Sequence, residues 1–169
     1  MNQNLFFTPT DILLPAHADM QRWSVIACDQ FTADAGYWQA VQDTVGDAPS
    51  TLRLMLPEFY LGKCDEAAAT REIQQTMRRY LDDGVFRTLP HSLVLVQRTL
   101  PGGTVRCGIV GALDLEAYDY APDSVTPIRA TEGTVASRLP ARVRIRAAAA
   151  LEMPHIMVFY SDPEDTIRR

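Results

Sequence analysis

The chain has 169 residues, of which 47% are hydrophobic and 22% charged, a composition typical of a folded globular protein rather than a disordered one. Its formal net charge is −5, which argues against sequence-independent binding to nucleic acid, because such binding needs a broad basic surface. No apolar run approaches the roughly 18 residues of a membrane-spanning helix, and the start, MNQNLFF, lacks the basic segment and the apolar core that a signal peptide has. We therefore expect one cytoplasmic domain without a membrane partner.

The first elements along the chain are an extended arm, a strand and a helix. Residues 6–15 predict the arm or a short strand, and the apolar, β-branched run 23–28 predicts a strand. Apolar residues at helical spacing then predict a helix over 33–45, which Thr32 or Asp34 can cap.

The remaining elements alternate between helix and strand. A second helix is expected over 65–82, where acidic residues open the pattern and a glycine follows it. The segments 92–99 and 104–113 flank Leu-Pro-Gly-Gly and predict a hairpin. A third helix is expected over 140–152, with a proline in its first turn and a run of four alanines near its end, and a last strand over 155–160.

These elements predict an α+β fold. We expect a mixed or mostly antiparallel sheet built around the central hairpin, about 92–113, and flanked by the three helices. The last residues, 161–169, begin a turn or helix that has no room to finish. The sequence therefore predicts that residues 1–169 are a single domain forming the N-terminal portion of a longer protein.

The three cysteines, Cys28, Cys64 and Cys107, are widely spaced and form no Cys-x-x-Cys pair. Neither a zinc site nor a disulfide framework is predicted from this spacing. We expect three reduced and mostly buried thiols.

Positive charge is concentrated between residues 128 and 146, where five arginines stand against one glutamate. If the helix begins near Pro140, Arg142 and Arg146 lie one turn apart on one face, and Arg138 joins them if the preceding turn is helical. Arg144 then points elsewhere.

This arginine stretch has two interpretations. In the functional one, the arginines, with Arg129 and the backbone amides around Gly133, hold a phosphate or carboxylate group. In the structural one, they form a solvated helix face that pairs with Glu132, Glu152 and the acidic loop 114–123. The residue pattern alone favours the structural interpretation.

Other signals for chemistry are weaker. The sequence contains neither of the standard glycine-rich phosphate-binding motifs and no Gly-x-Ser-x-Gly nucleophile motif. Asp29, at the end of the predicted strand 23–28, suits a ligand contact and suits equally a turn or helix cap. Tyr37 and Trp38 could stack on a nucleobase, although aromatics at helical spacing are more often core residues.

Several segments together resemble one protein family. In chain order they are WSVIACDQ (23–30), YW (37–38), GDAPSTL (46–52), DLEAYDY (114–120), IRATEGT (128–134) and PHIM (154–157). They resemble the N-terminal part of the bacterial family known as domain of unknown function 1015, over nearly the whole chain. That family is distantly similar to the ParB and sulfiredoxin superfamily, so the resemblance implies nucleotide or phosphate chemistry.

The resemblance also implies site residues. In other branches of the family the segment matching 131–134 reads His-Glu-x-Thr and is followed by an arginine that matches Arg138. Glu132, Thr134 and Arg138 are therefore candidates, whereas Thr131 here replaces the histidine and removes an acid-base group. Family members are about twice as long and carry a downstream Asp-Gly-(His/Asn)-His signature that is absent here.

The leading hypothesis is an incomplete phosphate- or nucleotide-binding domain of a phosphotransfer enzyme that binds ADP, ATP or another small anion. It needs the missing C-terminal portion of the same protein, and the 169 residues alone are expected to be inactive. Glu132 and Asp29 are the candidate catalytic residues, and no metal ligands are assigned. The candidate anion-binding residues are Arg129, Thr131, Thr134, Arg138, Arg142 and Arg146.

Two alternatives remain open. One is a non-catalytic regulatory or nucleic-acid-associated binding module, against which the acidic composition counts. The other is a structural domain whose arginines only bridge acidic groups.

Overall fold

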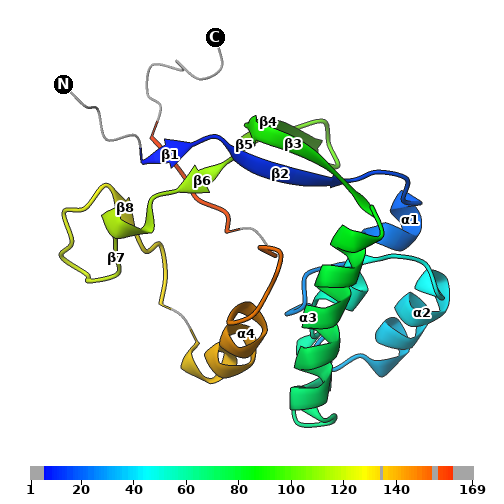
Figure 1. Ribbon diagram of the computed structural model, residues 1–169. Coiled ribbons are helices and arrows are strands. Elements are labelled where there is room, and N and C mark those ends of the chain that lie inside the picture. Colours follow the sequence, from blue (N-terminus) through cyan, green and yellow to red (C-terminus); the bar gives the residue numbers. More distant parts are fainter. Residues whose placement is uncertain (1–5, 134, 154–155, 162–169) are drawn as a thin grey trace. The chain divides into compact units, whose positions relative to one another are not determined.

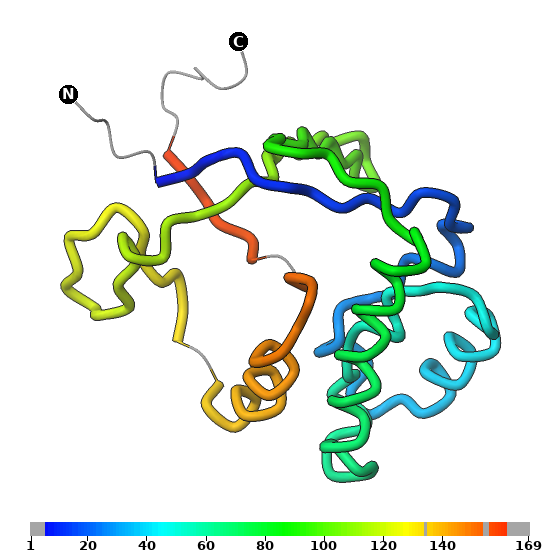
Figure 2. Tube along the Cα trace, in the orientation of Figure 1, coloured from blue at the N-terminus to red at the C-terminus, as the bar shows by residue number. Residues whose placement is uncertain are grey.

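The computed structural model describes residues 6–133, 135–153 and 156–161 (Figure 1). Thr134, a candidate site residue, and His155, the first residue of the last predicted strand, lie outside the described residues. The chain forms two compact units: unit 1 comprises Met1–Asp19 and Arg79–Pro140, and unit 2 comprises Met20–Arg78 and Ala141–Arg169. Figure 2 follows this path, in which each unit takes two separate segments of the chain. The single-domain organisation stays a prediction.

Unit 1 holds the strands, which pair two by two. Its short 3-10 helices are η3 (Leu115–Ala117) and η4 (Ala136–Arg138). The antiparallel pairs are β1 (Phe7–Thr8) with β6 (Ala112–Leu113), β2 (Thr10–Pro15) with β3 (Phe86–Ser92), and β4 (Val94–Thr99) with β5 (Val105–Val110). β7 (Tyr118–Asp119) and β8 (Ile128–Arg129) pair in parallel. The α+β class is thus confirmed, with small two-stranded sheets in place of one larger sheet.

The predicted hairpin is confirmed as β4 and β5, in a register that runs from Val94 opposite Val110 to Thr99 opposite Val105. Its turn closes through a hydrogen bond from the Leu100 amide to the Thr104 carbonyl at 2.8 Å. Gly102 has a φ of 95° and Gly103 one of 86°, a backbone that only glycine adopts readily. The Leu-Pro-Gly-Gly sequence therefore determines this turn.

Unit 2 is mostly helical and contains α1 (Met20–Trp23), α2 (Ala35–Val45), η1 (Thr51–Leu54) and η2 (Glu58–Tyr60). The helices α3 (Glu66–Asp82) and α4 (Leu139–Arg146) each begin in one unit and end in the other. The two predicted helices at 33–45 and 65–82 are confirmed as α2 and α3.

Both helices begin at aspartates that cap them. The Asp34 carboxylate accepts the Tyr37 amide at 2.9 Å, and the Asp65 carboxylate accepts the amides of Ala67 and Ala68 at 3.0 Å each. Capping of this kind satisfies amides that the first helical turn leaves without a partner.

The core of unit 2 forms around large side chains from three elements. Trp38 on α2 and Met77 on α3 are 0% exposed, and Leu54 of η1 is 1% exposed. The indole nitrogen of Trp38 donates to the Phe31 carbonyl at 3.1 Å, so burial of this ring leaves no polar atom unsatisfied. This core fixes the segments that carry the site described below.

Two predicted strands are wrong. Of residues 23–28, Trp23 ends α1 and the rest form no strand. In the last predicted strand, the described residues 156–160 are not strand either, and all five side chains are exposed. Apolar, β-branched composition favours an extended chain, but a strand also needs a partner, and no described residue pairs with either segment.

The third predicted helix is too long. α4 ends at Arg146, and the alanine run 147–150 lies in turns and bends. Two side chains of α3 donate hydrogen bonds to backbone carbonyls at this end of α4. Gln74 donates to the carbonyls of Arg144 and Ile145 at 2.9 and 3.0 Å, and Arg78 donates to the carbonyl of Ala148 at 3.1 Å. These tertiary hydrogen bonds outweigh the intrinsic helix preference of alanine.

The cysteines also differ from expectation. Cys28 is half-buried, but Cys64 and Cys107 are exposed, so most of the thiols are not buried.

Candidate functional site

The predicted site residues divide between the two units. Asp29, Arg142 and Arg146 belong to unit 2, and the residues predicted between 129 and 138 belong to unit 1. Each group is therefore described within its own unit.

Asp29 and Arg142 meet in unit 2 at a mixed cluster of charges. The Nη2 of Arg142 donates to Glu58 Oε1 at 2.8 Å and lies 3.6 Å from Asp29 Oδ2. The Glu58 side chain is 10% exposed, that of Asp29 34% and that of Arg142 44%. One guanidinium group thus has a partly buried carboxylate and a more accessible one beside it.

Three elements position this cluster. Asp29 lies in a turn closed by the Gln30 amide on the Ala27 carbonyl at 3.1 Å, and Gln30 Nε2 donates to Asp29 Oδ1 at 3.2 Å. Glu58 opens η2, and its amide donates to the Cys28 carbonyl at 2.8 Å. Arg142 comes from α4. The backbone bond from Glu58 holds the two acidic segments together.

The pKa values of two groups in the cluster, Cys28 and Arg142, are shifted by their surroundings. Burial raises the pKa of the Cys28 thiol, an effect that the positive charge of Arg142 opposes in part. Burial acts to lower the pKa of Arg142, but the hydrogen bond to Glu58 and the charge of Asp29 outweigh it, so its pKa is raised. Arg142 therefore stays charged, and Cys28 stays a thiol at neutral pH.

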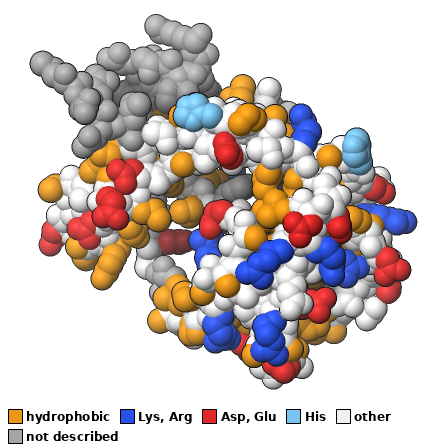
Figure 3. Space-filling view, viewed as in Figure 1, with side chains coloured by type: hydrophobic (Ala, Val, Ile, Leu, Met, Phe, Trp, Pro, Cys, Tyr) orange, Lys and Arg blue, Asp and Glu red, His pale blue; other side chains and the backbone are white. Residues whose placement is uncertain are grey.

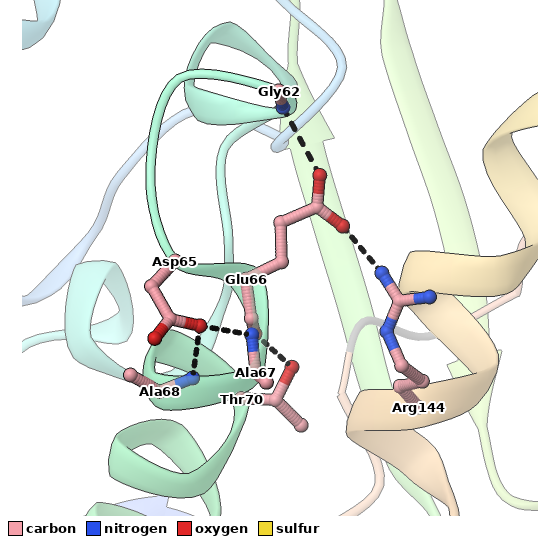
Figure 4. Close-up of polar contacts among 7 residues, drawn as sticks. All are labelled: Gly62, Asp65, Glu66, Ala67, Ala68, Thr70 and Arg144. Atoms are coloured by element: carbon pink, nitrogen blue, oxygen red, sulfur yellow. Dashed lines mark hydrogen bonds and ion pairs between the residues drawn. The ribbon is translucent and has the colours of Figure 1, made fainter.

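Arg144 points away from this cluster, as the helical pattern predicts, and binds the start of α3. Its Nη2 contacts Glu66 Oε2, and Glu66 Oε1 accepts the Gly62 amide at 3.0 Å (Figure 4). Asp65 caps the same turn of α3, so acidic side chains already occupy this helix start. The contact between Arg144 and Glu66 joins α4 to α3.

Arg146 pairs with Glu152 at 2.8 Å between Nη1 and Oε1, as the structural interpretation of the arginine stretch expects. The side chains are 44% and 64% exposed, and an exposed pair of this kind contributes little to stability. Arg142, Arg144 and Arg146 of α4 therefore each contact a carboxylate, although the partner residue differs.

The candidates in unit 1 lie near the surface. The register of β7 and β8 places Arg129 opposite Asp119. Thr131 and Glu132 lie in an exposed bend, and Arg138 is an exposed residue of η4. In Figure 3, acidic and hydrophobic side chains gather on the visible face around β7 and β8. Exposed residues in this part of the chain include Leu115, Tyr120 and Val125.

A cavity of about 210 Å³ lies in unit 2 beside α2. It is lined by Gln21, Ser24, Val25, Ile26, Tyr37, Ala40, Val41, Thr44 and Val45. Tyr37 stacks on Phe31 with ring centroids 4.0 Å apart, and Phe31 has a φ of 50°, which is rare for a bulky residue. Tyr37 is thus a cavity-lining residue, whereas its neighbour Trp38 belongs to the core.

Sequence reasoning did not identify Glu58, the residue in closest contact with Arg142. Pro57 before it marks a turn, but no spacing pattern connects position 58 to position 142. Among the described residues, no group of three or more His, Cys, Asp or Glu side chains could hold a metal ion. None of the helices in the same described part is long and apolar enough to cross a membrane.

Comparison with protein families gives one result: the family model described as "Protein of unknown function (DUF1015)" matches residues 9–169. No curated protein and no solved structure matches the chain.

Proposed function

Because the chain belongs to the DUF1015 family of proteins of unknown function, its function is inferred from its residues, and we propose that it is a phosphate- or nucleotide-binding domain of a phosphotransfer enzyme. The proposal includes a distant relationship to the ParB and sulfiredoxin superfamily, which the resemblance of its sequence segments implies. ADP and ATP are the proposed ligands.

One observation carries the proposal: Asp29 and Arg142, both selected from the sequence, lie 3.6 Å apart in unit 2. They come from segments more than a hundred residues apart, and a third segment holds them through Glu58. An arginine beside a partly exposed carboxylate offers two functions that phosphate chemistry needs. The guanidinium binds phosphate oxygens, and the carboxylate orients or deprotonates a hydroxyl group.

The exposure of the cluster suits access by a ligand. The Arg142 side chain is 44% exposed although its Nη2 is bonded to Glu58, so part of this side chain is accessible to solvent. In the proposed reaction Arg142 binds the phosphate group and Asp29 contacts the ligand as a general base. Cys28 is no nucleophile in this reaction, because burial raises its pKa and keeps it protonated.

The candidate residues of unit 1 are considered separately from the cluster in unit 2. Glu132 is an exposed carboxylate and is proposed as a second acid-base group. Arg129, Thr131, Thr134 and Arg138 are proposed as anion contacts within unit 1, and Arg146 is proposed as one within unit 2. These assignments rest on residue type and on the resemblance.

A titration tests the proposal. Isothermal titration calorimetry on the full-length protein with ADP, ATP and inorganic phosphate should give saturable heat that survives moderate salt and disappears in Arg142→Ala. The matched control is Arg71→Ala, which removes an exposed arginine from α3 and should bind as the unmodified chain does. Equal binding by both variants, or no heat with any of the three ligands, would show that the proposal is wrong.

A purely structural role is the second candidate, favoured by the carboxylate partners of Arg142, Arg144 and Arg146. It predicts that Arg142→Ala lowers the melting temperature and that the unmodified chain binds none of the ligands. Thermal unfolding of the unmodified chain and of Arg142→Ala, each recorded with and without millimolar phosphate, separates the two candidates. A ligand that binds the native state raises the melting temperature.

A further inference from the structure

We propose that Phe31 stacks on the nucleobase of a bound nucleotide whose phosphate group is held by Arg142. This inference rests on the proposed function and specifies its ligand class: the protein takes nucleotides, and a phosphate without a base binds more weakly. It follows from the exposure, the aromatic contacts and the backbone conformation of Phe31.

Phe31 and Tyr37 form a stacked aromatic pair. Their ring centroids lie 4.0 Å apart and the ring planes are inclined by 13°. Tyr37 also meets the ring of Trp38 edge-on, with centroids 5.3 Å apart, and Trp38 is 0% exposed. The pair is therefore anchored on the core of unit 2, whereas Phe31 itself remains 48% exposed. Much of this apolar residue is thus accessible to a ligand.

The backbone of Phe31 is held in an unfavourable conformation. Its φ is 50°, in a region where a bulky side chain is an outlier and where glycine or asparagine fits more easily. Two hydrogen bonds to its carbonyl maintain this conformation, because the Asp34 amide and the Trp38 indole nitrogen each donate to it at 3.1 Å. Backbone outliers of this kind are concentrated at ligand-binding sites. The strain offsets the gain from one aromatic pair, so packing on Tyr37 alone does not account for a phenylalanine here.

Phe31 lies close to the proposed phosphate site. Only Gln30 separates it from Asp29, so the Cα atoms of Asp29 and Phe31 are at most about 7 Å apart. Gln30 holds this segment, because its amide donates to the Ala27 carbonyl at 3.1 Å and its side chain donates to Asp29 Oδ1 at 3.2 Å. The segment that places a carboxylate beside Arg142 therefore also carries an exposed aromatic ring. A nucleotide has a matching pair of groups, because one sugar carries both a phosphate and a planar base.

Stacking selects nucleotides as a class and not one base among them. Bases stack on aromatic side chains through their π-faces, which every base has, so the contact tolerates a change of base. One stacked base adds about 5- to 150-fold to affinity. A sugar phosphate lacks this contact and depends on the phosphate group alone.

AMP and ribose 5-phosphate isolate the contribution of the base. Both carry a phosphate monoester on the same carbon of ribose, and only AMP has adenine. Titration calorimetry on the full-length protein should show that AMP binds about 5- to 150-fold more tightly. Phe31→Asn removes the ring and places at this position a residue that adopts a positive φ more readily. In this variant the affinity for AMP should fall to that for ribose 5-phosphate, which itself should not change.

Two further variants serve as controls. Phe31→Tyr keeps an aromatic ring at this position and should retain the preference for AMP. Tyr120→Asn removes an aromatic residue of unit 1 that is 79% exposed, and it should leave both affinities unchanged. The melting temperature of each variant establishes that it is folded before the titrations are compared.

The outcomes separate this inference from the proposed function. Equal binding of AMP and ribose 5-phosphate by the unmodified protein would overturn the inference, although the protein would still bind phosphate groups. A preference for AMP that persists in Phe31→Asn would also overturn it, because the base then binds elsewhere. If neither AMP nor ribose 5-phosphate binds, the inference fails as well, and the titrations with ADP, ATP and inorganic phosphate decide on the proposed function by themselves.

Discussion

Arg142 and Glu58 lie 84 residues apart in the sequence, and a hydrogen bond of 2.8 Å joins the guanidinium of one to the carboxylate of the other. Glu58 is largely buried, at 10% exposure, while Arg142 is 44% exposed. The pair joins α4 to the segment that begins η2, so it contributes to the fold of unit 2 whether or not a ligand binds there.

The contribution of the Arg142–Glu58 pair to the stability of the protein can be measured. Arg142→Ala should lower the free energy of unfolding by about 1–2 kcal/mol, because it leaves the carboxylate of Glu58 partly buried without its cation. Glu58→Gln should cost less, since a neutral amide needs no counter-charge. A double-mutant cycle by urea denaturation should give a coupling energy of about 0.5–1 kcal/mol. Additive effects of the two changes would show that the pair contributes nothing to stability.

The three thiols should differ in reactivity. Cys28 is half-buried and its pKa is raised from 9.0 by burial, so only a small thiolate fraction exists at pH 8. Cys64 and Cys107 are exposed. Iodoacetamide should therefore alkylate Cys64 and Cys107 first, as peptide mass spectrometry would show, and the rate at Cys28 should keep rising beyond pH 9.0. Alkylation of Cys28 as fast as of Cys64 at pH 8 would contradict the half-buried environment.

Asp65 should stabilise α3 in a manner that depends on pH. Its pKa is lowered from 3.8, first by the hydrogen bond from the Ala68 amide and further by that from Ala67. A folded-state pKa below the unfolded value means that the contribution is complete above about pH 4 and is lost as the pH falls through the folded-state pKa.

Asp65→Ala should therefore lower the melting temperature at pH 7, and the difference from the unmodified chain should shrink as the pH falls below 3.8. Asp82→Ala, at the opposite end of α3, serves as the control for removal of one negative charge. A difference that stays constant between pH 7 and pH 3 would mean that the ionised carboxylate is not what caps the helix.

Helices with local start and stop signals could be predicted from the sequence. Asp34 precedes α2 and Gly46 follows it, and the structure uses both as caps. The hairpin of β4 and β5 could be predicted for the same reason, because its turn residues and its two strands are neighbours in the chain. Each of these elements is determined by interactions within about twenty residues.

Elements that need a distant partner could not be predicted. The runs 23–28 and 156–160 have strand composition but no partner strand among the described residues. Conversely, β3 contains Pro90, which argues against a strand, yet it pairs with β2, which lies near the start of the chain. The alanine run after α4 lies in turns and bends, where Arg78 donates to the Ala148 carbonyl, while Gln74 donates to the carbonyls of Arg144 and Ile145 at the end of α4.

In the candidate site, too, the sequence indicated some residues, while contacts between distant segments could be found only in the structure. Residue type and position pointed to Asp29 and Arg142, and their approach is a finding of the structure. Glu58 carried no signal, because a single glutamate after a proline in a turn is unremarkable until its distant partner is known. Sequence reasoning therefore finds the residues suited to chemistry more readily than the residues that hold them.

The two glycines of the 104–113 segment, Gly108 and Gly111, differ in how closely other atoms approach them. A Cβ atom added at Gly111 would lie 2.6 Å from Cζ of Phe7, 2.7 Å from Cδ2 of Leu93 and 2.8 Å from the Thr8 carbonyl oxygen. The same atom at Gly108, on β5, would meet nothing within 4 Å. Neither glycine has a positive φ, so the difference between the two positions is one of space and not of backbone conformation.

Gly111→Ala should consequently destabilise unit 1 by about 1–3 kcal/mol, because the backbone oxygen of Thr8 cannot move aside as a flexible side chain could. Gly108→Ala should be neutral or slightly stabilising, since it adds no clash and reduces the freedom of the unfolded chain. Urea denaturation measures the difference in stability between the two variants. Hydrogen exchange at the amides of β1 and β6 shows whether the loss of stability lies at this strand pair. Equal stability of the two variants would mean that β1 does not lie against Gly111, and the pairing of β1 with β6 would then be wrong.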